Sequence, residues 1–249
     1  MNVYGVIPAR FASTRFPGKP LKMINGQPLL SWVIQASKKS QKIQKIVVAT
    51  DDRRIADLAV KEGVEVAMTD SDLATGTDRV WKAIEHKNLE VVINIQGDEP
   101  LIQSSLLDSL VGCFENDSGL QMATLGRKLD AEALESPNTA KIILNKNDEA
   151  IYFSRFAIPY SRDKSDTSLS GALKHIGLYA YRKNFLESFC QQPPVAIELA
   201  EGLEQLRALY LGAKIKVLRV DSESWGVDTP DDVQKIEKIM LERGIKCPK

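Results

Sequence analysis

Three cations lie in one short segment near the start of the chain. Residues 8–21 read PARFASTRFPGKPL, so Arg10, Arg15 and Lys19 are separated only by apolar, hydroxyl and glycine residues. Fixed cations and backbone N–H groups together are what bind the spread negative charge of a phosphate chain. The segment therefore predicts a triphosphate site.

Two common phosphate-binding motifs do not explain this segment. It is not a Walker loop, because Ser13 stands where the first glycine of that motif belongs and Pro20 stands where a Ser or Thr must follow the lysine. The sequence also lacks GxGxxG, so a dinucleotide-binding fold of the usual kind is not expected.

Asp98, at the end of a predicted strand, is suited to a hard cation, and Asp228 lies in a loop just before a predicted helix. Asp98 lies in a Gly-Asp-Glu-Pro turn after the apolar run 91–95, and Asp228 precedes a predicted C-terminal helix. Mg²⁺ in proteins is usually held by one or two carboxylates together with phosphate and water. Asp98, at the carboxyl edge of the sheet, is well placed for this role, although each aspartate alone also reads as an ordinary turn or capping residue.

The first hundred residues alternate between short β-branched runs and amphipathic stretches. Strands are expected at 3–7, 46–50, 64–68 and 91–95, and helices at 28–40, 53–62 and 78–87. This order predicts an α/β fold with a doubly wound, mostly parallel sheet. Ligands of such sheets bind beyond the carboxyl ends of the strands, which is where Arg10 and Asp98 fall.

The pattern changes between residues 131 and 182. Closely spaced strands at 140–144, 151–154 and 176–181 predict a small antiparallel β insertion within a single domain of 249 residues. A helix at 197–211, a strand at 215–220 and a helix at 230–243 then return to the α/β pattern. The last helix has a clear start, because Thr229 can cap it and Pro230 suits its first turn.

The composition limits the partners of the chain. Lys plus Arg and Asp plus Glu both number 33, so no overall positive charge favours nucleic acid or an anionic membrane. The three cysteines, Cys113, Cys190 and Cys247, are widely spaced and fit neither a disulfide framework nor a zinc site. No signal peptide or apolar span is visible. A cytoplasmic protein without membrane insertion is expected.

The segment 8–21 closely resembles the corresponding pattern of sugar nucleotidyltransferases of the CMP-Kdo synthetase family, where Kdo is 3-deoxy-manno-octulosonate. The resemblance extends over nearly the whole chain, through seven further short motifs in the family's order. These are ATDD at 49–52, TGTDR at 75–79, QGDEP at 96–100, YFSR at 152–155, HIGLY at 175–179, LEQLR at 203–207 and GVDTP at 226–230. Each is weak alone and together they are specific. Thr75 is a departure, since a serine is common there.

The resemblance implies an enzyme that transfers CMP from CTP to the anomeric 2-hydroxyl of Kdo, with Mg²⁺ as cofactor and pyrophosphate as the second product, for lipopolysaccharide biosynthesis. The implied nucleotide-binding residues are Arg10, Ser13, Arg15, Lys19, Thr75, Gly76, Arg79 and Asp98. The implied sugar-binding residues are Gln96, Arg155, His175, Tyr179, Glu204 and Gln205. Lys19, Arg15, Asp98 and Asp228 carry the implied catalytic role, and Asp98 and Asp228 hold the metal.

Several alternatives stay open at this stage. Residues 75–78 also read as a plain helix cap, and His175 also reads as a buried core histidine. The acidic sugar could be an amino-substituted Kdo or another nonulosonic acid, because the nucleotide motifs would be shared. A nucleotide-binding regulator without turnover is the alternative from another class, although the intact Arg10 and Lys19 speak against it.

A homodimer is expected as well. The strand-rich insertion offers edges that one subunit leaves open, and the family pairs through this region. No side chain in the motifs is an obvious general base.

Overall fold

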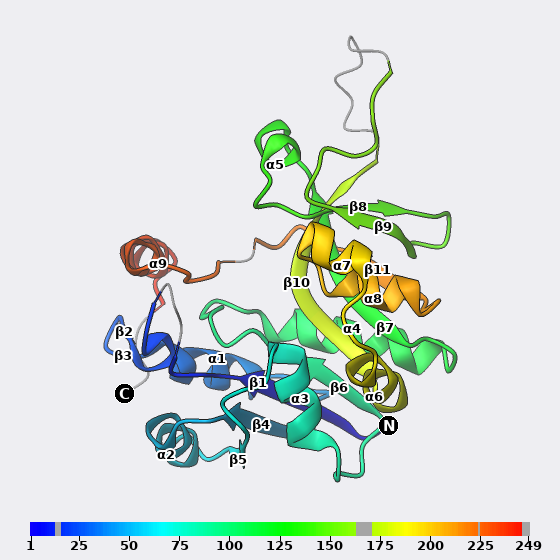
Figure 1. Ribbon diagram of the computed structural model, residues 1–249. Coiled ribbons are helices and arrows are strands. Elements are labelled where there is room, and N and C mark those ends of the chain that lie inside the picture. Colours follow the sequence, from blue (N-terminus) through cyan, green and yellow to red (C-terminus); the bar gives the residue numbers. More distant parts are fainter. Residues whose placement is uncertain (13–15, 163–170, 224, 246–249) are drawn as a thin grey trace. The chain divides into compact units, whose positions relative to one another are not determined.

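The computed structural model of the protein describes residues 1–12, 16–162, 171–223 and 225–245 (Figure 1). The chain forms two compact units. The first unit comprises Met1–Asp108 and Glu223–Lys249, and the second comprises Ser109–Ser222. Ser13 and Arg15, two of the predicted nucleotide-binding residues, lie outside the described residues.

A parallel sheet forms the centre of the first unit. Its strands run in the order β6 (Val91–Asn94), β1 (Val3–Pro8), β4 (Lys45–Thr50) and β5 (Glu65–Met68). The residues of β1 and β6 are almost all buried, as expected for parallel strands covered on both faces. The chain moves from β1 outward to β5 and then returns to the other side of β1, so the predicted doubly wound order is confirmed.

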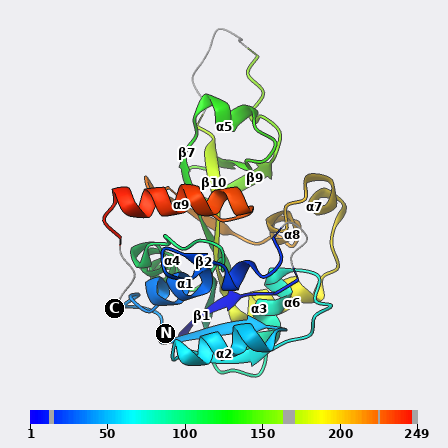
Figure 2. The same cartoon turned by 90° about the vertical axis from the view of Figure 1, so that its left-hand side faces the viewer.

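Helices α1 (Leu29–Ser37), α2 (Arg53–Lys61) and α3 (Gly76–Ile84) make the crossovers between these strands (Figure 2). Right-handed crossovers in opposite directions place α1 and α2 on one face of the sheet and α3 on the other. The helices are shorter than predicted at their carboxyl ends. In addition, α3 begins at Gly76, two residues before its expected start, because Thr75 is its N-cap.

The sequence analysis missed a small hairpin that precedes α1. After the 3-10 turn η1 (Lys19–Leu21), strands β2 (Met23–Ile24) and β3 (Gln27–Pro28) pair in antiparallel fashion. Both turn residues, Asn25 and Gly26, have positive φ angles, of 45° and 90°. The dipeptide Asn-Gly is the strongest short signal for such a turn, so the hairpin was predictable.

The C-terminal helix α9 (Pro230–Glu242) packs against this hairpin (Figure 2). Asn25 fixes the contact, because its backbone N–H donates to Glu237 and its side-chain amide donates to the carbonyl of Ile245. A shared apolar cluster lies beneath. It contains Phe16, Ile24, Leu29, Trp32, Val227, Val233, Ile236 and Met240. Helix α9 is thereby held beside the hairpin and Phe16.

Strands β7 (Met122–Lys128), β8 (Lys141–Leu144), β9 (Ala150–Ser154), β10 (Leu173–Arg182) and β11 (Ile215–Arg219) form the sheet of the second unit. Strand β7 pairs with β11 in parallel and with β10 in antiparallel fashion, and β8 joins β10 to β9. The antiparallel pairing of the three strands predicted between 131 and 182 is confirmed. Strand β7 was not predicted.

The remaining helices are α4 (Ser104–Asn116), α5 (Ala131–Glu135), α6 (Lys183–Gln191), α7 (Ala196–Glu201) and α8 (Gln205–Tyr210). The prediction of one helix over 197–211 was wrong. Gly202 adopts a left-handed conformation, with φ 60°, and ends α7 before α8 begins. No helix in the described parts of the chain has the length and apolar character that crossing a membrane requires.

Gly97 allows a close approach between the loop after β6 and the end of β1. A Cβ atom at this position would lie 3.0 Å from the carbonyl oxygen of Pro8 and 3.4 Å from Cγ2 of Ile7. A backbone oxygen cannot move aside as the tip of a side chain can. The loop that carries Asp98 therefore depends on a glycine here.

We predict that Gly97→Ala lowers the free energy of unfolding by about 1–3 kcal/mol, because the added methyl group pushes two backbone segments apart. Urea denaturation measures this change. Gly119→Ala is the matched control: it lies in an exposed loop, and its Cβ would meet only Asp117 at 3.4 Å. The control should change stability by less than about 0.5 kcal/mol. Equal stability of the two variants would contradict the steric argument.

Candidate active site

Lys19 lies between two aspartates that are far from it in sequence. Its Nζ is 2.6 Å from Oδ2 of Asp98 and 3.6 Å from Oδ1 of Asp228. All three residues belong to the first unit, so the structure brings together the predicted metal ligands and the predicted catalytic lysine. Two carboxylates and one ammonium leave one negative charge in excess, which favours a further cation.

Backbone hydrogen bonds fix the two loops that carry these aspartates. The N–H of Val227 donates to the carbonyl of Asp98 at 2.9 Å, which joins the loops directly. The carboxylate of Asp232 then accepts from the N–H of Asp228 at 3.1 Å and from the N–H of Thr229 at 2.9 Å. Burial opposes the charge on Asp232, but these hydrogen bonds outweigh it and lower the pKa of Asp232 to about 2. The capping carboxylate is thus ionised at neutral pH.

The donor set fits Mg²⁺, with substrate oxygens completing the shell. Within the described residues no group of three or more His, Cys, Asp or Glu side chains could hold a metal ion. Asp98 and Asp228 would therefore supply two carboxylates, and the other ligands would come from phosphate and water, as is usual for this hard cation.

The phosphate-binding loop begins directly after β1, where Arg10 is exposed. The N–H of Gly18 donates to the carbonyl of Phe11 at 2.9 Å and closes the loop. The ring of Phe11 packs against Gly18. The guanidinium of Arg54 stacks on the same ring, with its central carbon 3.6 Å from the ring centroid. Arg54 also pairs with Asp52 at 2.7 Å, and this hydrogen bond lowers the pKa of Asp52 although burial opposes it.

Arg54 was missed in the sequence analysis. It lies in the first turn of α2, directly after the motif at 49–52, and adds a cation beside the phosphate-binding loop. Its position after that motif was the available signal, but its contact with Phe11 joins residues that are far apart in sequence.

The predicted nucleotide-binding turn at the start of α3 is a complete capping box. Oγ1 of Thr75 accepts from the N–H of Asp78 at 3.1 Å, and the carboxylate of Asp78 accepts from the N–H of Thr75 at 3.2 Å. The helix-cap interpretation is therefore confirmed, and the predicted contact of this turn with the nucleotide stays a prediction. Gly76 lies beside Pro8, since a Cβ there would be 3.6 Å from Cγ of Pro8.

Arg79 points into the interior of the first unit. Its side chain is 3% exposed, pairs with Asp51 at 3.3 Å and donates to Oγ1 of Thr69. These contacts give Arg79 a structural role, and its predicted contact with the nucleotide stays a prediction.

Five of the six predicted sugar-binding residues belong to the second unit, and Gln96 belongs to the first.

His175 and Tyr179 lie on β10 with ring centroids 5.3 Å apart. Nε2 of His175 is 3.0 Å from Oγ1 of Thr124, whose hydroxyl is also 2.9 Å from the carbonyl of Leu178. If the hydroxyl donates to that carbonyl, the imidazole must donate to the hydroxyl, which assigns the proton to Nε2.

His175 and Tyr179 are both uncharged at neutral pH. Burial lowers the pKa of His175 to about 3. Burial also raises the pKa of Tyr179, and the negative charge of Glu204 adds to this shift. These two side chains can therefore donate and accept hydrogen bonds, but neither is poised to exchange a proton.

Arg155 and Gln205 offer donors in the same unit. The guanidinium of Arg155 donates to the carbonyls of Pro137, Glu201 and Gly202 at 3.2, 2.9 and 3.3 Å. A guanidinium has more N–H donors than these three carbonyls use. Gln205 is 4% exposed, and its Nε2 finds no hydrogen-bond acceptor within the described parts of the chain. A buried donor of this kind is typical of a ligand site.

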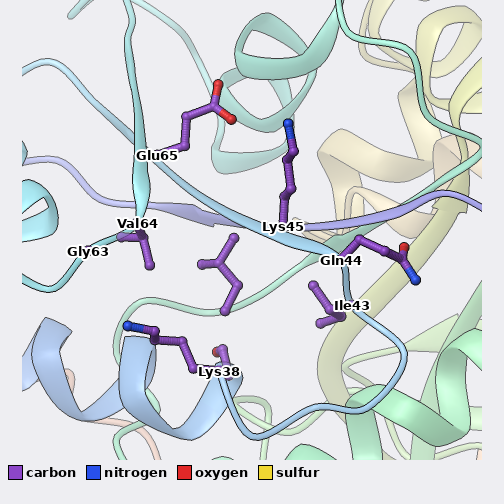
Figure 3. A pocket seen from close by; sticks show the side chains of 9 residues that line it. Lys38, Ile43, Gln44, Lys45, Gly63, Val64 and Glu65 are labelled. Carbon is purple, nitrogen blue, oxygen red and sulfur yellow. The ribbon is translucent and has the colours of Figure 1, made fainter.

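A separate pocket of about 420 Å³ lies at the opposite edge of the first unit's sheet (Figure 3). Lys45 and Glu65 line it from the first residues of β4 and β5, and Lys38 lines it from the end of α1. None of the predicted site residues contributes to this pocket.

Comparisons with known proteins agree on one family. The cytidylyltransferase family profile matches residues 4–215. The 3-deoxy-manno-octulosonate cytidylyltransferase of Bdellovibrio bacteriovorus is 53% identical over 98% of this chain and 100% of its own length. The enzyme of the same name from Geobacter sulfurreducens is 42% identical over 95% of this chain and 98% of its own length.

The solved structures give the same result. The structure of CMP:2-keto-3-deoxy-manno-octonic acid synthetase complexed with CTP superposes with a TM-score of 0.92 at 36% identity, covering 98% of this chain and 100% of that one. The structure of 4-diphosphocytidyl-2C-methyl-D-erythritol synthase from Anaerococcus prevotii shares the fold alone. Its identity is 13% and its TM-score is 0.67, covering 96% of this chain and 98% of that one. The predicted α/β nucleotidyltransferase fold is confirmed. The chain belongs to the family of 3-deoxy-manno-octulosonate cytidylyltransferases.

Proposed function

We propose that the protein transfers CMP from CTP to the anomeric 2-hydroxyl of Kdo and releases pyrophosphate, which activates Kdo for lipopolysaccharide biosynthesis. The single observation that carries this proposal is the cluster of Lys19, Asp98 and Asp228. In this cluster an ammonium lies between two carboxylates, which supports a site for Mg²⁺ and phosphate in a chain of this family.

The reaction is the attack of the sugar hydroxyl on the α-phosphorus of CTP. Lys19 would offset the charge that builds up on the phosphate oxygens, and Arg10 and Arg15 would hold the triphosphate. Mg²⁺, held by Asp98 and Asp228, would neutralise phosphate charge and favour the ionised form of the hydroxyl. Catalysis of this kind rests on positioning and electrostatics rather than on covalent chemistry by the protein.

The described side chains supply no strong general base. With a pKa of about 3, His175 is a weak base at neutral pH. We therefore assign His175 and Tyr179 to binding of the sugar acid, together with Gln96, Arg155, Glu204 and Gln205. The burial of Gln205 and its unused amide donor support this assignment.

We also propose that the protein is a cytoplasmic homodimer. Ile151, Phe156 and Tyr160 expose 57%, 79% and 81% of their surface in or just after β9. Strand β9 pairs only with β8 among the described strands. Exposed apolar side chains that gather in one segment are typical of an interface between subunits. Cys113 and Cys190 are free thiols, as a reducing compartment favours.

Replacement of Asp98 or Asp228 by Asn should lower kcat by a factor on the order of 10² or more, because each change removes a charge that holds the metal beside an anionic triphosphate. If the two carboxylates act on one metal, the double variant should lose little more than the worse single variant. Asp231→Asn, at an exposed position in the first turn of α9, is the control and should keep normal activity. Near-normal kcat of Asp98→Asn or Asp228→Asn at low-millimolar Mg²⁺ would exclude this metal site.

The choice of substrates tests the function itself. Pyrophosphate release should require both CTP and Kdo, and kcat/KM should favour CTP over UTP, ATP and GTP by a factor on the order of 10² or more. The physical reason is that cytosine offers an amine donor where uracil offers an acceptor, and the backbone of the turn at 75–77 can read this difference. Comparable kcat/KM for UTP would contradict the proposed base recognition, and a better acidic sugar than Kdo would change the assigned substrate.

Light scattering should show a dimer at micromolar protein concentration. Phe156→Glu should shift the protein toward monomers, because a charge in an apolar interface is costly. Val60→Glu, at a 65% exposed position of α2 in the first unit, is the control and should leave the dimer intact. A monomeric wild-type protein would contradict the proposed assembly.

A further inference from the structure

Both backbone polar groups of Arg155 are bound by charged side chains. Its N–H donates to Oε2 of Glu201 at 2.8 Å, and its carbonyl accepts from Nζ of Lys141 at 2.6 Å. All three residues belong to the second unit. Arg155 follows the last residue of β9, where the pairing with β8 has ended, so the strand ladder does not account for these contacts.

Lys141 is fully buried, and all the donors of its ammonium group are used. Besides the carbonyl of Arg155, Nζ donates to the carbonyls of Ser136 and Thr139 at 2.8 and 2.9 Å. Burial lowers the pKa of Lys141, while the nearby charges of Glu135 and Glu201 raise it. A buried ammonium is costly to a fold unless it is fully hydrogen-bonded. Here its three hydrogen bonds go to backbone carbonyls, and they join Arg155 to the segment 136–139.

Glu201 makes one further contact with Arg155 and one with its neighbour. Its carbonyl accepts from Nε of Arg155, and its carboxylate also accepts from Oγ of Ser154 at 2.6 Å. Glu201 is the last residue of α7, and the left-handed Gly202 that follows turns its own carbonyl toward the same guanidinium. The guanidinium thus lies at the carboxyl end of a helix, where a cation is favoured.

The segment that follows carries two more of the proposed sugar-binding residues. Glu204 and Gln205 come directly after the Gly202 turn, at the start of α8. The contacts of Glu201 and Gly202 with Arg155 therefore fix the guanidinium beside the chain segment that leads into Glu204 and Gln205.

We propose that Lys141 and Glu201 are positioning residues for the acidic sugar: they hold Arg155 so that its remaining N–H donors meet the carboxylate of the substrate. This inference rests on the proposed function. The physical gain is preorganisation, because an arginine held at its backbone and at its guanidinium loses little further freedom on binding. A planar, fixed fork of donors also matches a carboxylate in geometry and charge.

The test compares Glu201→Ala with Glu201→Gln in steady-state kinetics. Glu201→Ala should raise the KM for Kdo roughly tenfold, because loss of these contacts misplaces Arg155, and should leave the KM for CTP within about twofold. Glu201→Gln should recover most of the wild-type value, since an amide oxygen can still accept from the N–H of Arg155 and the Ser154 hydroxyl can reverse its role. Glu187→Ala, at an exposed position of α6, is the matched control and should change neither KM.

A double-mutant cycle separates positioning from general stability. In an Arg155→Ala background, Glu201→Ala should add less than about twofold to the KM for Kdo, because the group it positions is already gone. Lys141→Met should show the same pattern if it folds. Thermal unfolding of every variant is measured in parallel, and a fall in melting temperature without the selective change in KM would overturn the inference.

The outcomes also distinguish this inference from the proposed function. Normal turnover of CTP and Kdo by the wild-type protein, with an unchanged KM for Kdo in Glu201→Ala, would overturn the positioning role alone. An unchanged KM in Arg155→Ala would overturn it too, since there would be no sugar contact to position. Failure of the wild-type protein to release pyrophosphate from CTP and Kdo would overturn the function and this inference together.

Discussion

The contact of Lys19 with Asp98 and Asp228 places like charges close together, and the first unit is organised around holding them there. Two carboxylates beside an anionic triphosphate repel the substrate unless cations are fixed among them. Lys19 and Asp98 can meet only if the loops that carry them are adjacent. The doubly wound order makes these loops adjacent, because it makes β1 and β6 neighbours. The loops that follow these strands, with Lys19 in one and Asp98 in the other, therefore open at the same edge of the sheet.

The third member of this cluster depends on packing far from the charges. Asp228 reaches Lys19 only because α9 returns to the hairpin β2–β3 and shares an apolar cluster with Phe16 and Trp32. The hydrogen bond from Val227 to the carbonyl of Asp98 then sets the distance between the loops. Loss of apolar packing under α9 would thus displace Asp228 from Lys19 and from the proposed metal site without changing either carboxylate.

The sequence was sufficient to predict the features that rest on local patterns and on motifs. Alternating β-branched runs predicted the strands of the first unit, and the motif around Asp98 predicted its place at the sheet edge. The break between α7 and α8 was missed because apolar periodicity continues across Gly202. Lys141, Glu201 and Arg54 were missed for a different reason: each acts through a contact with a residue that is distant in sequence, and no local pattern marks such a contact.

Charge serves opposite purposes in the two units. In the first, Arg10 and Asp228 are exposed and Lys19 and Asp98 are partly exposed, in the region proposed to bind phosphate and metal. In the second, Lys141, Glu198 and Arg207 are buried and Glu201 is partly buried, and their charges are used within the protein, with Glu198 and Arg207 paired in the interior. The rings of His175 and Tyr179, on β10 of the same unit, stay neutral. As proposed sugar-binding residues, His175 and Tyr179 would orient a hydroxyl by hydrogen bonds but would not accept its proton.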